Sequence, residues 1–231
     1  MTEIRCKLQH LEPLTDAVQK VVLRPETPMP FMHGQYLRVV MGADDRRPFS
    51  IANTPDDDTL ELHIGATPDN AYAWAVLEAI KSNQGCSIDG PHGNAHLRTD
   101  KTMPSILLAG GTGYSYVHSV LQGLLKHNGK EPVFLYWGVR HAADLYDMEN
   151  LLALQTTHKH LRIIPVVEFA DADWQGRTGR VHEAVEADFT SLEPYRVYVA
   201  GRFEMAGVAR EAFREKGLLS DNLFGDAYAF I

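Results

Sequence analysis

One stretch near the middle of the chain, residues 105–115, constrains the fold more than any other part of the sequence. It reads Ser-Ile-Leu-Leu-Ala-Gly-Gly-Thr-Gly-Tyr-Ser. The apolar run at 106–109 has the length and composition of a buried parallel strand. After the glycines, apolar residues recur at the spacing of one helix face, at Tyr116, Val117, Val120, Leu121, Leu124 and Leu125. A strand, a tight turn and a helix in this order predict a parallel α/β fold.

The turn between this strand and this helix is a candidate nucleotide site. It consists of Gly110, Gly111, Thr112 and Gly113. Backbone N–H groups and the positive end of a helix dipole attract phosphate, and residues without side chains let a pyrophosphate approach. The run is not the six-position Gly-x-Gly-x-x-Gly fingerprint, because Ser115 and Tyr116 stand where its last glycine would be. A turn without a ligand is the alternative, and the flanking strand and helix favour nucleotide binding.

The residue patterns before and after position 100 differ, which predicts two domains. Short strand-like runs come first, at 4–11, 18–23, 35–41, 49–52, 60–66 and 86–89. One helical stretch at 71–81 interrupts them, with an apolar side formed by Tyr72, Ala75, Val76, Ala79 and Ile80. They suggest a small antiparallel barrel. Strand runs at 106–109, 133–139, 163–168 and 197–200 then alternate with helical patterns at 114–126, 146–156, 181–187 and 205–215. This alternation predicts a doubly wound parallel sheet. We expect a domain at 1–99, a linker near 100–104 and a second domain at 104–231.

Composition excludes several classes of function. The 231 residues carry 22 Lys and Arg against 30 Asp and Glu, a net charge of −8, which argues against nucleic-acid binding. Cys6 and Cys86 lack metal or redox spacing, and no metal site is expected from His158 and His160 because a third ligand is missing nearby. The sequence shows no signal core and no membrane-length apolar run. We expect a soluble, cytoplasmic protein.

A second informative stretch, residues 47–52, places a cation, a ring and a hydroxyl close together on a strand. With a side-chain period of two, Arg47 and Phe49 point to one side and Pro48 and Ser50 to the other. On this pattern alone, an ordinary strand with a surface arginine is the favoured interpretation.

Several motifs in order give this stretch more meaning. They are Arg-x-Phe-Ser-Ile-Ala at 47–52, Gly-Gly-Thr-Gly at 110–113, Gly-x-x-x-Met at 201–205 and an aromatic C-terminal tail. Together they resemble the ferredoxin–NADP reductase superfamily over the whole chain. Within it, the chain is similar to the bacterial NAD(P)H:flavin oxidoreductases, the general flavin reductase and its relative in luminous bacteria. The resemblance implies a six-stranded antiparallel flavin-binding β-barrel followed by a Rossmann-like α/β domain that binds NAD(P)H.

The resemblance also implies a reaction, hydride transfer from nicotinamide C4 to flavin N5, in which the cofactors supply the chemistry. Ser50 would be the catalytic residue beside N5, and Arg47 would meet the polar chain or phosphate of the flavin. The implied flavin-binding residues are Arg47, Pro48, Phe49, Ser50, Ile51, Ala52 and Tyr228.

Family position likewise implies a set of residues for the dinucleotide. They are Gly110, Gly111, Thr112, Gly113, Arg140, Gly201, Arg202, Phe203 and Met205. Arg140 and Arg202 could instead be solvated surface residues. The strand at 133–139 is not followed by an acidic residue that would select ribose hydroxyls, Asp144 being the nearest, so the choice between NADH and NADPH stays open.

One departure from the family pattern affects the flavin. Segment 65–71 lacks the glycine-serine turn with which relatives hold the diphosphate of a resident FAD. This favours riboflavin, FMN or FAD as a visiting substrate, reduced for an acceptor such as ferric iron or a luciferase. The alternatives are a reductase with bound FAD that serves an iron–sulfur or oxygenase partner, and a nucleotide sensor without activity. We expect a monomer or a homodimer that acts on small molecules, without nucleic acid or membrane.

Overall fold

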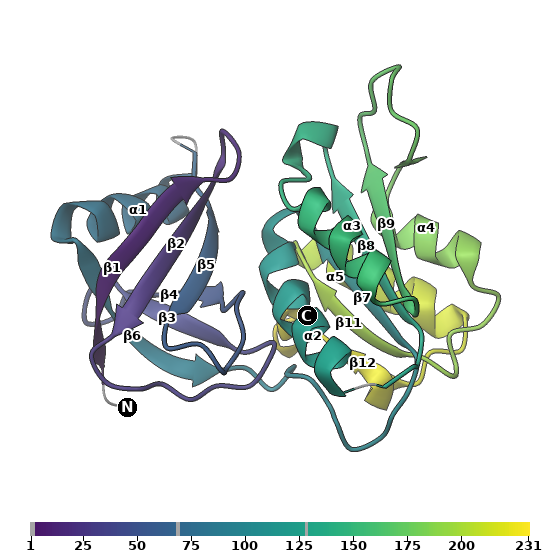
Figure 1. Cartoon of the computed structure of the whole chain (residues 1–231), viewed down its shortest axis with the longest axis horizontal. Coiled ribbons are helices and arrows are strands. Elements are labelled where there is room, and N and C mark those ends of the chain that lie inside the picture. The colour runs from purple at the N-terminus through teal and green to yellow at the C-terminus, as the bar shows by residue number, and fades with distance from the viewer. Residues whose placement is uncertain (1–2, 68–69, 128) are drawn as a thin grey trace.

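The computed structural model describes residues 3–67, 70–127 and 129–231. Figure 1 shows two halves side by side, each built on one sheet. The six strands of the first sheet are all antiparallel, in the order β4-β3-β6-β1-β2-β5. The second sheet is parallel, in the order β10-β9-β8-β7-β11-β12. The predicted combination of an antiparallel β half and a parallel α/β half is therefore confirmed.

The first half consists of one sheet and one helix. Its elements are β1 (Ile4–Pro13), β2 (Val18–Pro25), β3 (Tyr36–Val40), β4 (Arg46–Ser50), β5 (Leu60–Gly65), α1 (Ala71–Asn83) and β6 (Gly85–His92). The backbone N–H of Ala52, just after β4, donates to the carbonyl of Glu61 on β5 (2.8 Å). This bond brings together the two strands that end the sheet order, and the sheet wraps around its own apolar core.

The second half has helices on both faces of its sheet (Figure 1). Its strands are β7 (Ser105–Gly110), β8 (Val133–Val139), β9 (Leu161–Val167), β10 (Arg177–Thr178), β11 (Arg196–Ala200) and β12 (Leu223–Phe224). Its helices are α2 (Tyr114–His127), α3 (Met148–Thr157), α4 (Val181–Asp188) and α5 (Phe203–Glu215). Leu107 and Ala109 of β7 face α2 and α3, whereas Ile106 and Leu108 face α4 and α5. Both faces are buried, which explains why this strand is a continuous apolar run.

Three local predictions need correction. The strand predicted at 49–52 is β4, Arg46–Ser50, because Ile51 and Ala52 turn away to bond Gln35 and Glu61. The buried face of α1 is formed by Ala73, Val76, Leu77 and Ile80. Tyr72, expected on that face, is 52% exposed. The two-residue strands β10 and β12 were not predicted, since they are too short to show a period.

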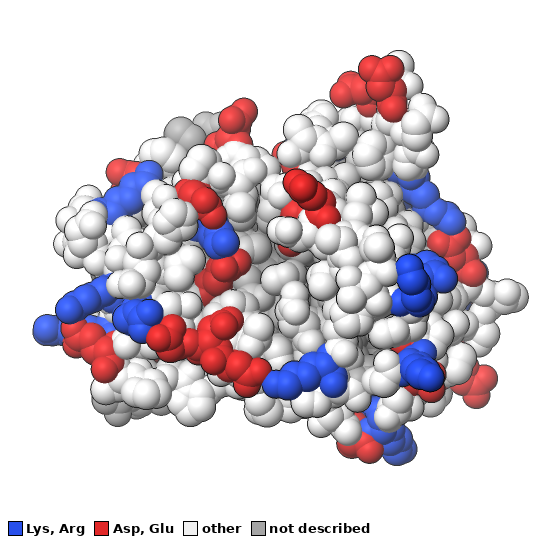
Figure 2. All heavy atoms as spheres, in the orientation of Figure 1, with Lys and Arg blue, Asp and Glu red and all other residues white. Residues whose placement is uncertain are grey.

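Helix α2 lies between the two halves. One side packs on the second sheet. Its other side approaches the first half so closely that a Cβ on Gly34 would lie 2.9 Å from Val120, and one on Gly123 would lie 2.7 Å from His33. Within the described residues, no helix has both the length and the apolar character needed to cross a membrane. On the face shown in Figure 2, Lys and Arg side chains are interspersed with acidic and uncharged ones.

A buried carboxylate joins three strands of the first sheet. Asp89 on β6 is 1% exposed. It accepts hydrogen bonds from Arg38 on β3 (2.8 and 3.1 Å) and Arg46 on β4 (2.5 Å), and it lies 2.5 Å from His92 Nε2. Burial alone would raise the pKa of Asp89, but the bonds from Arg38, His92 and Arg46 outweigh it and lower that pKa to about 2.

We expect Asp89→Asn to destabilise the protein at neutral pH. Breaking a buried ion pair costs about 3–5 kcal/mol, and we expect about 2 kcal/mol here because water reaches both arginines. The folded pKa of Asp89 lies below the unfolded value of about 3.9, so its contribution is complete above about pH 5 and is lost as the pH falls toward 2. Urea unfolding at pH 7 and pH 3 should show a gap between wild type and variant that narrows in acid.

The matched control is Asp58→Asn, which removes an exposed partner of Arg24. Exposed pairs contribute at most about 0.5–1 kcal/mol, so this variant should unfold almost as the wild type does. Equal losses in the two variants would contradict a special role for Asp89.

Candidate functional site

The glycine turn is compressed between two strand ends. Strand β7 ends at Gly110, residues Gly111–Gly113 form one turn of 3-10 helix, and α2 begins at Tyr114. A Cβ on residue 113 would overlap the carbonyl of Ala200, at the end of β11, so only glycine fits there. Gly111 has a φ of +53°, and a Cβ on it would meet nothing within 4 Å. The turn is therefore packed on one side and open on the other.

The residues predicted to share the dinucleotide site do lie around this turn. A Cβ on Gly110 would be 2.6 Å from the Met205 sulfur and 3.7 Å from the Cα of Gly201, so the segment after β11 packs on the end of β7. Arg202 and Phe203 are exposed where α5 begins. Arg140 is exposed just beyond the end of β8. All lie at the carboxyl ends of neighbouring parallel strands, the edge at which such sheets bind ligands.

Ser50 ends β4 on the face predicted for it. In the register of β3 and β4, Ser50 pairs with Tyr36 and Pro48 with Arg38, whereas Arg47 and Phe49 pair with the buried Val39 and Leu37. Tyr36 also pairs with His92 of β6, at 5.5 Å between ring centroids. Ser50 is partly exposed, and within the described parts of the chain its hydroxyl has no hydrogen-bond partner. The hydroxyl is free to bond a ligand.

The guanidinium of Arg47 is already occupied. Asp45 accepts from Nε (2.9 Å) and from the second terminal nitrogen (2.6 Å), and the Tyr72 carbonyl accepts from the first (2.5 Å). The guanidinium also lies 4.5 Å from the centroid of the Tyr72 ring. Asp45 thus neutralises the charge of Arg47, the cation that was expected to meet a flavin phosphate. The sequence did not indicate this pairing.

The remaining residues predicted for the flavin site offer a ligand either main-chain atoms only or a side chain whose polar group is already hydrogen-bonded. Ile51 and Ala52 are 0% exposed, so any contact they make with a ligand involves backbone atoms. The Tyr228 hydroxyl donates to the carbonyl of Ala206 on α5 (3.1 Å), and Arg210 lies over the Tyr228 ring. Nearby, burial raises the pKa of Asp226 to about 6.

An aromatic pair in this region was missed in part. Phe203, a predicted site residue, stacks on Phe230 at 6.0 Å, and their exposures are 54% and 70%. Phe230 belongs to the aromatic C-terminal tail that the sequence analysis singled out, but only Tyr228 of that tail was assigned to the site.

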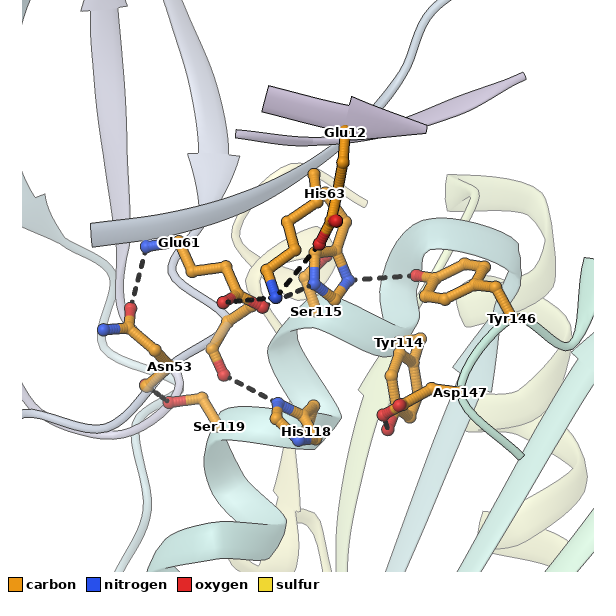
Figure 3. Close-up of polar contacts among 12 residues, drawn as sticks. Glu12, Asn53, Glu61, His63, Tyr114, Ser115, His118, Ser119, Tyr146 and Asp147 are labelled. Carbon is orange, nitrogen blue, oxygen red and sulfur yellow. Dashed lines mark hydrogen bonds and ion pairs between the residues drawn. The ribbon is translucent and has the colours of Figure 1, made fainter. Parts of the chain in front are cut away.

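The glycine turn and helix α2 are joined directly to the ends of strands β4 and β5 of the first sheet. A Cβ on Gly65, at the end of β5, would lie 3.2 Å from Thr112 of the turn. His118 of α2 lies 2.9 Å from the Ala52 carbonyl, and Ser119 donates to the Asn53 carbonyl (2.9 Å), as Figure 3 shows for these residues. Burial lowers the pKa of His118, so its neutral ring donates through Nδ1. The strand end after Ser50 is thereby fastened to the helix that follows the glycine turn.

The segment expected to lack a diphosphate turn is described in part, because Pro68 and Asp69 lie outside the described residues. Beyond them, Asn70 caps α1 by accepting from the N–H of Ala73 (3.3 Å), and its amide donates to the Gly65 carbonyl (3.2 Å). In the described part of the chain, His, Cys, Asp and Glu side chains do not group in threes at metal-binding geometry.

Comparisons with known proteins agree with this arrangement. The sequence model of the family described as the oxidoreductase NAD-binding domain matches residues 107–211. Over 235 residues, the chain is 48% identical to an NAD(P)H-flavin reductase of Vibrio harveyi and 47% identical to one of Aliivibrio fischeri, covering 99% of each protein in both cases. The structure of a cytochrome P450 reductase from Amycolatopsis is similar with a TM-score of 0.89 at 27% identity, over 97% of this chain and 69% of that one. Identity near one half along the full length of the chain places it in the family of NAD(P)H-flavin reductases, within the ferredoxin–NADP reductase superfamily.

Proposed function

We propose that residues 1–99 bind the flavin and residues 104–231 bind the nicotinamide nucleotide, so that the hydride crosses the junction between the halves. The observation that carries this proposal is the pair of hydrogen bonds between helix α2 and the residues that follow Ser50. They join His118 and Ser119 to the carbonyls of Ala52 and Asn53. Because α2 also begins at the glycine turn, one helix connects the two binding surfaces. The contact of Gly65 with Thr112 supports the same placement from β5.

The glycine turn fits a pyridine dinucleotide. Its outer side at Gly111 is open, and the backbone N–H groups of the turn that leads into α2 are suited to a pyrophosphate. Arg140 and Arg202 are the exposed cations that would meet the phosphates or the ribose. When bound, nicotinamide and flavin supply the hydride chemistry. The residues of this chain hold the two in place and exclude water.

Ser50 is the proposed catalytic residue. Its free hydroxyl lies at the end of β4 beside Tyr36, where it would donate a hydrogen bond to the flavin nitrogen that receives the hydride. Pro48 and the backbone of Ile51 and Ala52 would form the surface on which the flavin lies. Phe49 points to the other face of β4 and would meet the flavin only through the exposed part of its side chain. Tyr228 packs on α5 with its hydroxyl engaged, so we propose that its ring, and not its hydroxyl, borders the site.

We propose further that the flavin is a diffusible substrate. The side chain of Asn70 already caps the N-terminus of α1, where a resident FAD would otherwise find a phosphate site. Reduced flavin would then pass to an acceptor such as ferric iron or a luciferase.

The purified protein should therefore carry little flavin. We expect an absorption spectrum without the bands of an oxidised flavin, and oxidation of NADH or NADPH only after riboflavin is added. Stoichiometric FAD that survives gel filtration would instead indicate a reductase component with resident FAD. If NADH and NADPH are not oxidised even with riboflavin present, the remaining interpretation is a nucleotide sensor without activity.

Ser50→Ala should slow flavin reduction without weakening nucleotide binding. Loss of one hydrogen bond to the reacting group typically lowers the rate by about 10²-fold. Stopped-flow single turnovers would give the rate constant, and nucleotide titration would give the dissociation constant. Ser87→Ala, on β6 of the same sheet, is the control and should behave as wild type. An unchanged rate in Ser50→Ala would remove Ser50 from the mechanism.

Asp45→Asn should change the choice among flavins. Because Asp45 pairs with Arg47, removing its charge leaves a free cation for a flavin phosphate, and we expect kcat/KM for FMN to rise about threefold relative to riboflavin. Asp44→Asn makes the same change in net charge at an exposed neighbour and should leave the ratio unchanged. Equal shifts in both variants would mean that overall charge, and not Arg47, controls the ratio.

A further inference from the structure

Polar contacts of several kinds join the two halves. Three place a side chain of α2 on a main-chain carbonyl of the first half: Tyr116 on Ala95 (2.5 Å), His118 on Ala52 and Ser119 on Asn53. Near the end of α2, Lys126 pairs with the exposed Asp56 (2.6 Å). A different contact lies beside the glycine turn, where His63 of β5 meets Tyr146, which precedes α3. His63 Nδ1 is 3.0 Å from the Tyr146 hydroxyl, side chain to side chain, and His63 is 9% exposed.

The His63 ring is held from behind by a row of charged groups. Its Nε2 lies 2.9 Å from a Glu61 carboxylate oxygen, Lys20 lies 3.5 Å from the other oxygen, and Glu12 lies 3.6 Å from Lys20. Burial would raise the pKa of Glu61, but the hydrogen bond with His63 and the charges of His63, Lys20 and His118 together outweigh it and lower that pKa, so the group is a carboxylate. In the neutral His63 ring, Nε2 therefore carries the proton and Nδ1 accepts from the Tyr146 hydroxyl; Figure 3 draws this contact.

On the other side, Tyr146 packs against rings that reach the glycine turn. Its ring meets Trp137 edge-on at 4.9 Å and Tyr114 edge-on at 5.7 Å, and those two rings stack at 4.0 Å. The indole N–H of Trp137 donates to the Gly111 carbonyl (3.0 Å). The Tyr114 hydroxyl donates to Asp147, the residue after Tyr146. A continuous series of contacts thus leads from β5 to Gly111.

We propose that the hydrogen bond between His63 and Tyr146 is a positioning contact, which fixes how far the glycine turn stands from the flavin-binding sheet. This inference rests on the proposed function. His63 lies two residues before Gly65, where an added Cβ would be 3.2 Å from Thr112 of the turn, so the contact acts where the two substrates would meet. Reacting atoms must be held about 3–3.5 Å apart, and a displacement of about 1 Å can cost 10²-fold in rate. Neither His63 nor Tyr146 needs to touch a substrate to have this effect.

Tyr146→Phe tests the proposal, because it removes the hydroxyl and keeps the ring. We expect the single-turnover rate of flavin reduction to fall about tenfold, with nucleotide and flavin dissociation constants within about twofold of wild type. The kinetic isotope effect with C4-deuterated nucleotide should also become more dependent on temperature, since the reacting distance is then less well fixed. A merely structural role would lower the melting temperature without changing the isotope effect.

Tyr136→Phe is the matched control. Tyr136 precedes Trp137 on β8, and its hydroxyl donates to Asp188 (2.6 Å) on the face of the sheet covered by α4. This variant loses one buried hydroxyl and should keep the wild-type rate and isotope effect.

A double-mutant cycle identifies the pair. His63→Leu should slow the reaction as much as Tyr146→Phe does, the double variant should be no slower than either single one, and His63→Gln, whose amide oxygen can accept, should recover part of the rate. Additive losses, an unchanged rate in Tyr146→Phe, or an equal loss in Tyr136→Phe would each overturn the positioning role. A wild type that does not reduce flavin would remove the proposed function and this inference with it, whereas an active wild type with unaffected variants would remove the inference alone.

Discussion

At residue 113 the chain passes so close to the carbonyl of Ala200 that no side chain fits between them. On another side, Thr112 lies so close to the end of β5 that a Cβ on Gly65 would be 3.2 Å from it. The turn is therefore clamped between a strand of the second sheet and a strand of the first. Its free side, at Gly111, faces open space. Such a turn cannot shift without moving β5 or β11, so the position of anything bound on it is set by both halves together.

Helix α2 extends this constraint to the first sheet. Its second turn places His118 and Ser119 on the carbonyls of Ala52 and Asn53, immediately after the strand that carries Ser50. Main-chain carbonyls are suitable partners here because the chain leaving β4 has ended its pairing with β3 and has carbonyls to satisfy. The geometry of the proposed reaction thus depends on backbone positions as much as on the side chains of the family motifs.

Whether a feature could be predicted from the sequence depended on how far apart along the chain its residues lie. Strand β7 and the buried apolar positions of α2 were predicted, because burial of a strand on both faces leaves a continuous apolar run and burial of a helix leaves apolar residues three and four positions apart. That α2 packs on both halves was not predicted. The exposure of Tyr72 was missed since its ring pairs with Arg47, 25 residues away, instead of entering the core.

The candidate site follows the same rule. The glycine turn and the segment after β11 were found from motifs, and the structure brings them together. The pairing of Arg47 with Asp45 was not foreseen, because nothing in the order of residues shows whether a cation is neutralised by a neighbour or free for a ligand. His63 and Tyr146 are 83 positions apart and belong to no motif, so only the folded chain reveals them as partners. The roles assigned to the site residues remain predictions.

The two-sided packing of α2 also bears on how the chain folds. Tyr116 and Val120 approach Gly34 of the first half, and together with Leu121 and Leu124 they belong to a core that includes Ala95 and the strands of the second sheet. If the chain were cut near residue 100, the second fragment would expose the apolar surface of α2 to water. The first fragment would expose the surface that α2 covers. The two halves should therefore unfold in a single cooperative step. During synthesis, the first hundred residues would reach their final stability only after α2 has been made and has packed on them.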